Sequence, residues 1–171
     1  MTDTAVCILE NVGRAIYLFF PAYVANAIPV ILGGGTPVDL GRKFYDGRPI
    51  FGPHKTLRGL LSGILAGTLT GMIMHGSTLM GLLLSSGALI GDLVGSFFKR
   101  RIRREPGSPL FPLDQICFIL GAIGLLSIFR VPPASSVVTI IVITPPIHIL
   151  INRISRWLGI RETGSRSVDL E

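Results

Sequence analysis

Long apolar stretches constrain the fold of this chain more than any other feature. Four of them are about 18–24 residues long, which is enough to cross a bilayer as a helix. They are Leu57–His75, Ser77–Phe98, Pro112–Phe129 and Ser135–Leu158. A fifth, Ala15–Leu32, is interrupted by Pro21 and Pro29. Only 15% of the residues are charged, against about a quarter in soluble domains, so the sequence predicts an all-α membrane protein with five transmembrane helices.

Clusters of Lys and Arg predict which loops face the cytosol, because cationic loops stay on that side of the membrane. We number the stretches along the chain, so that Ala15–Leu32 is the first. One cluster lies between the first two stretches, a second follows the third stretch, and a third lies near the C-terminus. Their members are Arg42, Lys43, Arg48 and Lys55; Lys99, Arg100, Arg101, Arg103 and Arg104; and Arg153, Arg156 and Arg161. The other connections are nearly uncharged. We therefore expect the N-terminus outside, the C-terminus inside and two polar cytosolic loops.

Small residues and prolines give further expectations for the helices. Glycines recur every four residues in the second and third stretches, which lets helix backbones approach closely in lipid. They are Gly59, Gly63, Gly67 and Gly71, then Gly87, Gly91 and Gly95. This spacing predicts a tight hairpin of the second and third helices, with the first or fourth helix as a further neighbour. Pro145–Pro146 should break or kink the fifth helix, because neither residue can donate the helical hydrogen bond.

An acidic residue, Asp92, lies toward the end of the third apolar stretch. A carboxylate at membrane depth is costly, so it is by default a candidate functional residue. On a helix, Asp92, Ser96 and Lys99 would share one face and present a carboxylate, a hydroxyl and an ammonium group. A structural ion pair between Asp92 and Lys99 or Arg100 is the alternative.

Other polar residues gather at the same predicted cytosolic end of the helices. They are Asp114 and Gln115 of the fourth stretch, Asp46, Lys55, Thr56 and Arg58 of the first cytosolic loop, and Asn26 of the first stretch. Two carboxylates near a basic cluster suggest Mg²⁺ with a phosphorylated ligand, since Mg²⁺ is usually held by one or two carboxylates, waters and phosphate oxygens. The sequence therefore predicts a site at the inner membrane interface.

Several of these features have simpler interpretations. The run KRRIRR is also a topology signal, or an anchor for anionic lipid headgroups. Asn26 could instead hydrogen-bond to a neighbouring helix. His54, His75 and His148 have no metal-ligand spacing and are expected to be incidental. GPHKT does not meet the pattern GxxxxGK[ST], which excludes a phosphate-binding P-loop.

The sequence resembles the archaeal CDP-archaeol synthases, which are CTP:2,3-di-O-geranylgeranylglycerol-1-phosphate cytidylyltransferases. The matching segments are PAYVANAIPV, DGRPIFGPHKTLRG, GDLVGSFFKRR and PLDQICF, in the first four stretches and their cytosolic loops. The element S-x-x-K-R, Ser96 to Arg100, with a later aspartate, also resembles CDP-diacylglycerol synthases. The resemblance implies CTP and a prenylated glycerol phosphate lipid as substrates, Mg²⁺ as cofactor and the cell membrane as location. It implies no nucleic-acid partner, and it leaves the oligomeric state open.

The resemblance also implies roles for individual residues. Asp92 and Asp114 would act as metal-linked acids, with Lys99 as a further catalytic residue. Contacts to CTP or to the lipid phosphate would come from Lys55, Thr56, Arg58, Ser96, Lys99 and Arg100, and Asn26 and Asp46 would line the polar cavity. The family often has a second acid three residues after the equivalent of Asp114, where this chain has Cys117. Asp46 or waters would then complete the metal ligands.

Two other functions compete with this one. A small transporter would place polar groups near the middle of the membrane, whereas the charges here gather at one interface. A CDP-alcohol phosphotransferase would carry D-G-x2-A-R, but Asp46–Gly47 is followed by Arg48 and Pro49. We therefore expect one transmembrane catalytic domain over residues 1–163, and interpret residues 164–171 as a tail added for expression.

Overall fold

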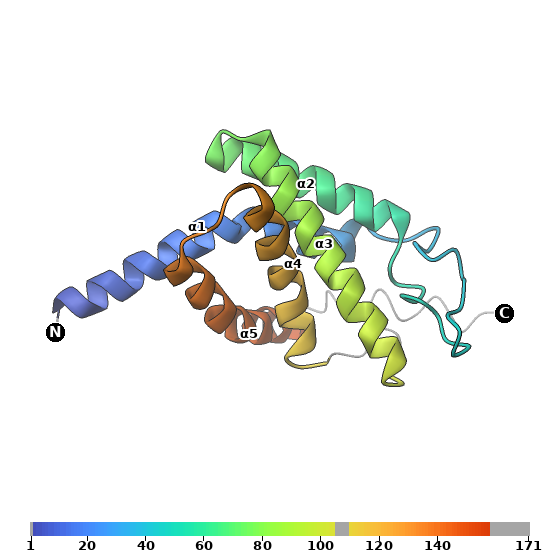
Figure 1. The fold of residues 1–171 in the computed structure, drawn as a ribbon. Coiled ribbons are helices and arrows are strands. Elements are labelled where there is room, and N and C mark those ends of the chain that lie inside the picture. Colours follow the sequence, from blue (N-terminus) through green and yellow to red (C-terminus); the bar gives the residue numbers. More distant parts are fainter. Residues whose placement is uncertain (1, 105–109, 158–171) are drawn as a thin grey trace.

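The structure, a computed structural model, describes residues 2–104 and 110–157, which form five α-helices (Figure 1). The helices are α1 (Thr2–Leu32), α2 (Leu57–His75), α3 (Thr78–Arg101), α4 (Leu113–Phe129) and α5 (Ala134–Trp157). A long connection, residues 33–56, joins α1 to α2, and we call it loop one. Within the described residues the chain is all-helical apart from two isolated strand-like bridges in loop one. The predicted all-α fold with five helices is confirmed, whereas residues 164–171 lie outside the described part.

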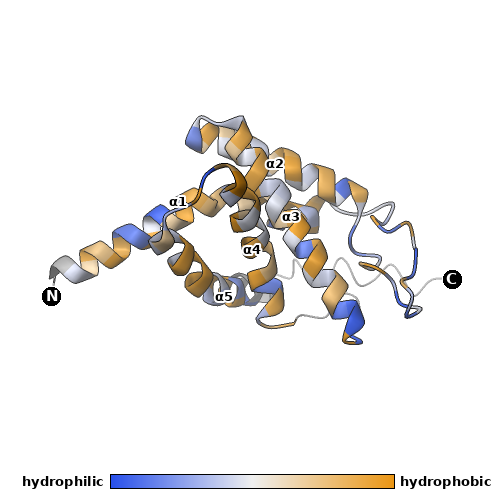
Figure 2. Ribbon diagram, viewed as in Figure 1, coloured by the Kyte–Doolittle hydropathy of each residue, from blue (hydrophilic) through white to orange (hydrophobic). Residues whose placement is uncertain are grey.

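Three helices of the described chain are long and apolar enough to span a membrane: Thr4–Leu32 of α1, then α2 and α3. The apolar helices Leu113–Phe129 and Ala134–Leu150 are shorter. Figure 2 shows apolar residues along most of each helix, and polar residues at the C-terminal end of α3 and in loop one. The polar surface is therefore concentrated at one end of α3 and in the loop beside it.

The prolines of α1 do not interrupt it, so the predicted interruption is wrong. The helix runs through Pro21 and Pro29 and begins at Thr2, not at Ala15 as expected. Pro29 cannot donate to the carbonyl of Ala25, and this carbonyl faces α2 at Gly63, where a Cβ would lie only 2.6 Å from it. A close neighbouring backbone thus covers the freed carbonyl, as occurs in membrane helices. The α5 helix likewise continues through Pro145 and Pro146, so the predicted break is absent.

The glycine repeats produce close helix contacts, as predicted, between α2 and α3 and with both α1 and α4. All four repeated glycines of α2 are buried, and the first three face α1 at Pro29, Ala25 and Pro21. Gly63 and Gly67 also face α3, and the fourth, Gly71, faces α3 at Gly81. The glycines of α3 in turn lie against α4, at Gly121 and Cys117. The repeats therefore order the helices α1, α2, α3 and α4 in a tightly packed series, instead of only closing the α2–α3 hairpin.

Gly67→Ala should destabilise this packing strongly. A Cβ on Gly67 would lie 2.6 Å from the Ser85 Cβ, 2.8 Å from the Pro21 carbonyl oxygen and 2.9 Å from the Ala25 Cβ. Overpacking of this kind costs about 1–3 kcal/mol, because neighbouring backbones have to move. The measurement is the thermal denaturation midpoint in detergent. Gly124→Ala is the matched control, since its Cβ would meet nothing within 4 Å. Equal midpoints for the two variants would contradict this account of the helix contacts.

The apolar core joins four of the helices. Its fully buried members are Ala15, Phe19 and Ala22 of α1, Leu84 and Ala88 of α3, Phe118, Ile119 and Ala122 of α4, and Ile140 of α5. Each turn of α3 is thereby fixed relative to α4. This packing holds the cationic last turn of α3 beside the acidic first turn of α4.

Candidate active site

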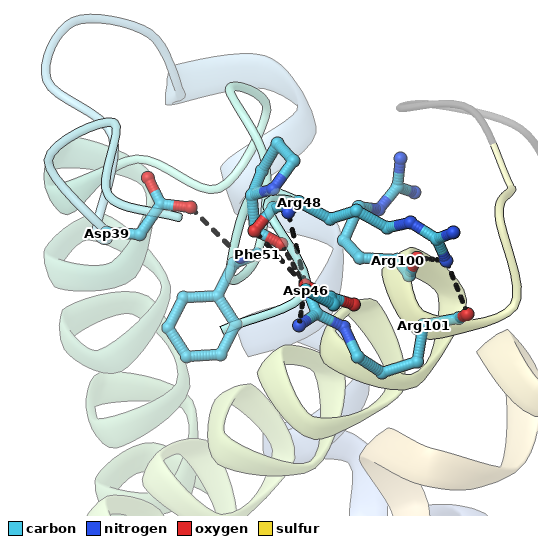
Figure 3. Close-up of polar contacts among 7 residues, drawn as sticks. Asp39, Asp46, Arg48, Phe51, Arg100 and Arg101 are labelled. Atoms are coloured by element: carbon cyan, nitrogen blue, oxygen red, sulfur yellow. Dashed lines mark hydrogen bonds and ion pairs between the residues drawn. The ribbon is translucent and has the colours of Figure 1, made fainter. Parts of the chain in front are cut away.

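A buried carboxylate, Asp39, organises loop one. It accepts backbone hydrogen bonds from Gly41 (3.1 Å), Phe51 (2.9 Å) and Gly52 (3.0 Å), and Figure 3 shows the bond to Phe51. Burial alone would raise the pKa of Asp39, but the amides of Gly52, Phe51 and Gly41 stabilise the anion and lower the pKa below its ordinary 3.8. Asp39 was not predicted as a functional residue. An aspartate two residues before a glycine is a recognised turn signal that could have identified it.

Asp39→Asn should loosen loop one at neutral pH, because an amide cannot accept all three hydrogen bonds. The folded-state pKa of Asp39 is lowered, so its stabilisation is fully present above 3.8 and is lost as the pH falls through the folded value. In the wild type, the opening free energy of the Phe51 and Gly52 amides, measured by hydrogen exchange, should stay constant between about pH 5 and pH 8. The variant should show weaker protection throughout that range. Equal protection in both proteins would contradict the role of Asp39.

Thr56 ends loop one and begins α2. Its hydroxyl oxygen accepts hydrogen bonds from the Gly59 amide at 3.2 Å, as a helix N-cap, and from the Gly34 amide at 3.1 Å. Thr56 therefore fixes both ends of loop one relative to α2. These hydrogen bonds of Thr56 place the neighbouring Lys55 at the start of α2, close to α3.

Two ion pairs connect the predicted acids and bases across elements. The Lys55 Nζ lies 2.5 Å from Asp92 Oδ2, which joins loop one to α3. The Lys99 Nζ lies 2.8 Å from Asp114 Oδ1, which joins α3 to α4. The Asp114 Oδ2 also accepts the Leu110 amide at 2.9 Å. The sequence suggested a partner for Asp92 on its own helix, whereas the structure pairs Asp92 with Lys55.

Both lysines line one cavity. It has a volume of about 90 Å³ and lies between loop one and the last two turns of α3. The lining residues are Phe51, Gly52, His54, Lys55, Ser96, Lys99 and Arg100. Ser96 and Arg100 are almost completely buried, with 3% and 5% of their surfaces exposed. The cavity thus combines a buried hydroxyl with three cationic side chains, and each of its two lysines forms an ion pair with a carboxylate. Such a set suits a polyanionic ligand.

Other predicted residues do not line this cavity. Asp46, in loop one, makes an ion pair with Arg101 of α3, at 2.8 Å between Oδ1 and Nη1. Arg58 is exposed in the first turn of α2, and Asn26 is half-buried on α1. Gln115 is buried at the start of α4, and its Oε1 has no hydrogen-bond partner within the described chain. The structure therefore brings together Lys55, Asp92, Ser96, Lys99, Arg100 and Asp114 from the predicted set.

Loop one contributes three cavity residues that were not predicted. Phe51 and Gly52 are held by Asp39, and His54, interpreted from the sequence as incidental, lines the cavity. His75 and His148 instead pack against aromatic rings, Tyr17 and Tyr23 respectively. The loop residues carry no periodic signal, because their placement depends on backbone hydrogen bonds within the loop.

The oxygen ligands are sufficient for a metal that is also bound by its substrate. Within residues 2–104 and 110–157, no group of three or more His, Cys, Asp or Glu side chains could hold a metal ion. Asp92 and Asp114 are paired with the two lysines that line the cavity, and Mg²⁺ commonly takes its other ligands from phosphates and water. Cys117 stands where the family often has a second acid. It packs against the α3 backbone, where a Cβ on Gly95 would lie 3.3 Å from its sulfur. Asp92 and Asp114 therefore match the donor chemistry of such a site.

Comparison with known proteins gives a consistent family. The model of the CarS-like family, CDP-archaeol synthase, matches residues 8–164. The CDP-archaeol synthase of Pyrococcus abyssi is 46% identical over 155 residues, covering 84% of this chain and 92% of that protein. The CDP-archaeol synthase of Methanocaldococcus jannaschii is 41% identical over 166 residues, covering 86% and 94%.

A solved structure agrees with the sequence relatives. It is described as an intramembrane enzyme for archaeal membrane lipid biosynthesis, and it superposes with a TM-score of 0.74 at 37% identity. The match covers 82% of this chain and 94% of that one. Sequence and helix arrangement therefore agree, and the chain belongs to the CDP-archaeol synthase family.

Proposed function

We propose that this protein transfers CMP from CTP to 2,3-bis-O-geranylgeranyl-sn-glycerol 1-phosphate, giving CDP-archaeol and pyrophosphate for membrane phospholipid synthesis. The relatives at 41–46% identity are CDP-archaeol synthases. The observation that carries the proposal is the cavity at the cationic end of α3, which is lined by the lysines of both lysine–aspartate pairs. A transporter lacks support, since these groups gather at one end of the helices and the relatives are named as synthases.

The site is proposed to face the cytosol, in a protein of five membrane spans with its N-terminus outside and its C-terminus inside. The support is the cationic character of loop one and of the last turn of α3, which lie side by side. CTP would enter from the cytosol, and the lipid phosphate would reach the same level from the bilayer.

We further propose that the enzyme depends on Mg²⁺ held by Asp92 and Asp114. When bound, the ion would neutralise phosphate charge and bring the two anionic substrates together. The paired lysines would then exchange their carboxylate partners for phosphate oxygens. Lys55 and Lys99 both line the cavity, so each needs only a small movement of its ammonium group to make this exchange.

The reaction needs little proton transfer from the protein. A phosphate monoester has its second pKa near about 6, so much of the lipid phosphate is a dianion at neutral pH. One of its oxygens attacks the α-phosphorus of CTP, the bond to the β-phosphate oxygen breaks, and pyrophosphate leaves with the bonding electrons. The side chains of Lys55, Lys99 and Arg100, with the Ser96 hydroxyl, position the phosphates and balance their charge.

The direct test supplies CTP labelled in its α-phosphate to purified protein in detergent or liposomes. Pyrophosphate release and labelled lipid should both appear only when the prenylated glycerol phosphate is added. A panel of the four nucleoside triphosphates and of ester-linked phosphatidic acid then defines specificity. Solute flux across proteoliposomes without CTP consumption would overturn the proposal in favour of transport.

A further inference from the structure

Arg101, at the end of α3, contacts loop one through both terminal nitrogens of its guanidinium group. Its Nη1 donates to Asp46 Oδ1 at 2.8 Å, and its Nη2 donates to the Pro49 carbonyl at 2.5 Å (Figure 3). The guanidinium also lies over the rings of Phe44 and Phe97, at 4.9 and 4.7 Å from their centroids. Hydrogen bonds in the plane and aromatic rings on the faces are contacts that only a guanidinium makes together.

Arg48 makes the reciprocal contact from loop one to α3. Its Nη1 donates to the carbonyl of Arg101 at 2.7 Å and to that of Arg100 at 3.3 Å. The last carbonyls of a helix have no partner within it and carry partial negative charge. Arg48 therefore caps α3, while Arg101 binds the loop that carries Arg48. We call this reciprocal pair, Arg48 and Arg101 with their contacts, the arginine clasp.

The arginine clasp joins the same two elements that form the cavity. Loop one supplies Phe51, Gly52, His54 and Lys55, and α3 supplies Ser96, Lys99 and Arg100. Arg101 directly follows a lining residue of α3, and the Pro49 carbonyl that it binds lies two residues before Phe51. The arginine clasp therefore joins the two cavity walls close to the residues that line the cavity.

We propose that Arg101 is a positioning residue, which holds loop one against α3 and thereby sets the affinity of the cavity for the triphosphate of CTP. This inference rests on the proposed function. The charge of Arg101 is directed at Asp46 and at backbone carbonyls, in contrast to the exposed side chains of Arg103 and Arg104 in the same basic run. Its effect on the reaction passes through Lys55 and the loop residues beside it.

Arg101→Lys keeps the charge and removes the planar fork. In this variant, loop one would spend part of the time detached from α3. The apparent affinity for CTP falls in proportion to the fraction of protein in which the loop is attached, so KM for CTP should rise about tenfold while kcat stays within about twofold. The KM for the lipid phosphate should change less than that for CTP. Arg104→Lys is the matched control, the same substitution at an exposed position of the same run, and should leave all parameters unchanged.

A second measurement separates positioning from direct ligand contact. Without any substrate, the loop one amides of Arg101→Lys and of Arg48→Lys should exchange hydrogen faster than those of the wild type. The double variant should resemble either single variant, because both arginines belong to one contact. Unchanged loop exchange with a raised KM would make Arg101 a direct phosphate ligand, and unchanged exchange and KM would make it structural only. Either result overturns the inference.

The outcome is distinguishable from failure of the proposed function. If wild-type protein consumed no CTP with any lipid phosphate, the proposed function would fail. Loop exchange needs no turnover, so it would still report whether Arg48 and Arg101 hold loop one. Conversely, an active wild type with unchanged exchange in both variants would refute only the arginine clasp.

Discussion

Replacing Asp92 or Asp114 by asparagine is expected to lower turnover at least about a thousandfold, the effect of losing about 4 kcal/mol of charge stabilisation at the transition state. Asparagine keeps the shape of the side chain and removes the charge that Mg²⁺ requires. Each variant also loses the carboxylate partner of Lys55 or Lys99. The measurement is pyrophosphate release at saturating CTP and lipid phosphate, over a range of Mg²⁺ concentrations.

The control for this prediction is Glu10→Gln. Glu10 is an exposed carboxylate of α1 whose partner is Arg14, one helical turn away. This variant should keep wild-type turnover and Mg²⁺ dependence. All three variants should retain the thermal midpoint of the wild type to within a few degrees. If either Asp92→Asn or Asp114→Asn retained near-normal activity while folded, the assignment of these residues to the metal would be wrong.

Lys99→Gln is expected to lower turnover about a hundredfold or more, which is typical for loss of one preorganised donor to a developing charge. The Lys99 side chain is 13% exposed, lines the cavity and makes its ion pair between α3 and α4. Pyrophosphate leaving from the α-phosphorus gains negative charge, which a nearby ammonium group stabilises without any proton transfer. The measurement is single-turnover formation of the labelled lipid product, which isolates the chemical step from product release.

Lys43→Gln is the matched control for Lys99→Gln. Lys43 is an exposed lysine of the same cationic end of the protein and is not one of the residues that line the cavity. The control should retain turnover, because exposed charges separated by about 10 Å or more are largely screened at 0.1 M salt. A similar loss of turnover in both variants would mean that bulk positive charge, and not the position of Lys99, assists the reaction.

The helices could be predicted from local sequence because each depends on a continuous apolar run. The predicted stretch Leu57–His75 has the same bounds as α2. The fourth stretch differs from α4 by one residue at its start, and the fifth differs from α5 by one residue at each end. The first helix was predicted too short, since charged residues interrupt the apolar pattern of its N-terminal turns and its prolines are covered by a neighbouring helix. This packing of a neighbouring helix against the prolines is a tertiary contact, so no local sequence pattern predicts it.

The candidate site was predictable only in part. Asp92, Ser96 and Lys99 follow a helical spacing, and Asp114 begins the next helix, so their approach follows from the packing of α3 on α4. The partner of Asp92 could not be predicted, because Lys55 reaches it through the folded path of loop one. The same holds for Asp39, whose acceptor role depends on amides twelve and thirteen residues away in sequence.

The two lysine–aspartate pairs also bear on how the empty enzyme tolerates the bilayer edge. Each ammonium group is balanced by its own carboxylate, so neither pair adds net charge to a region where solvation is poor. An arriving nucleotide would therefore meet lysines that are already paired with carboxylates. Its binding would replace each carboxylate by a phosphate oxygen. Under the proposed function, selectivity would depend on whether a ligand can replace both carboxylates at once, which a single small anion such as free phosphate would not do.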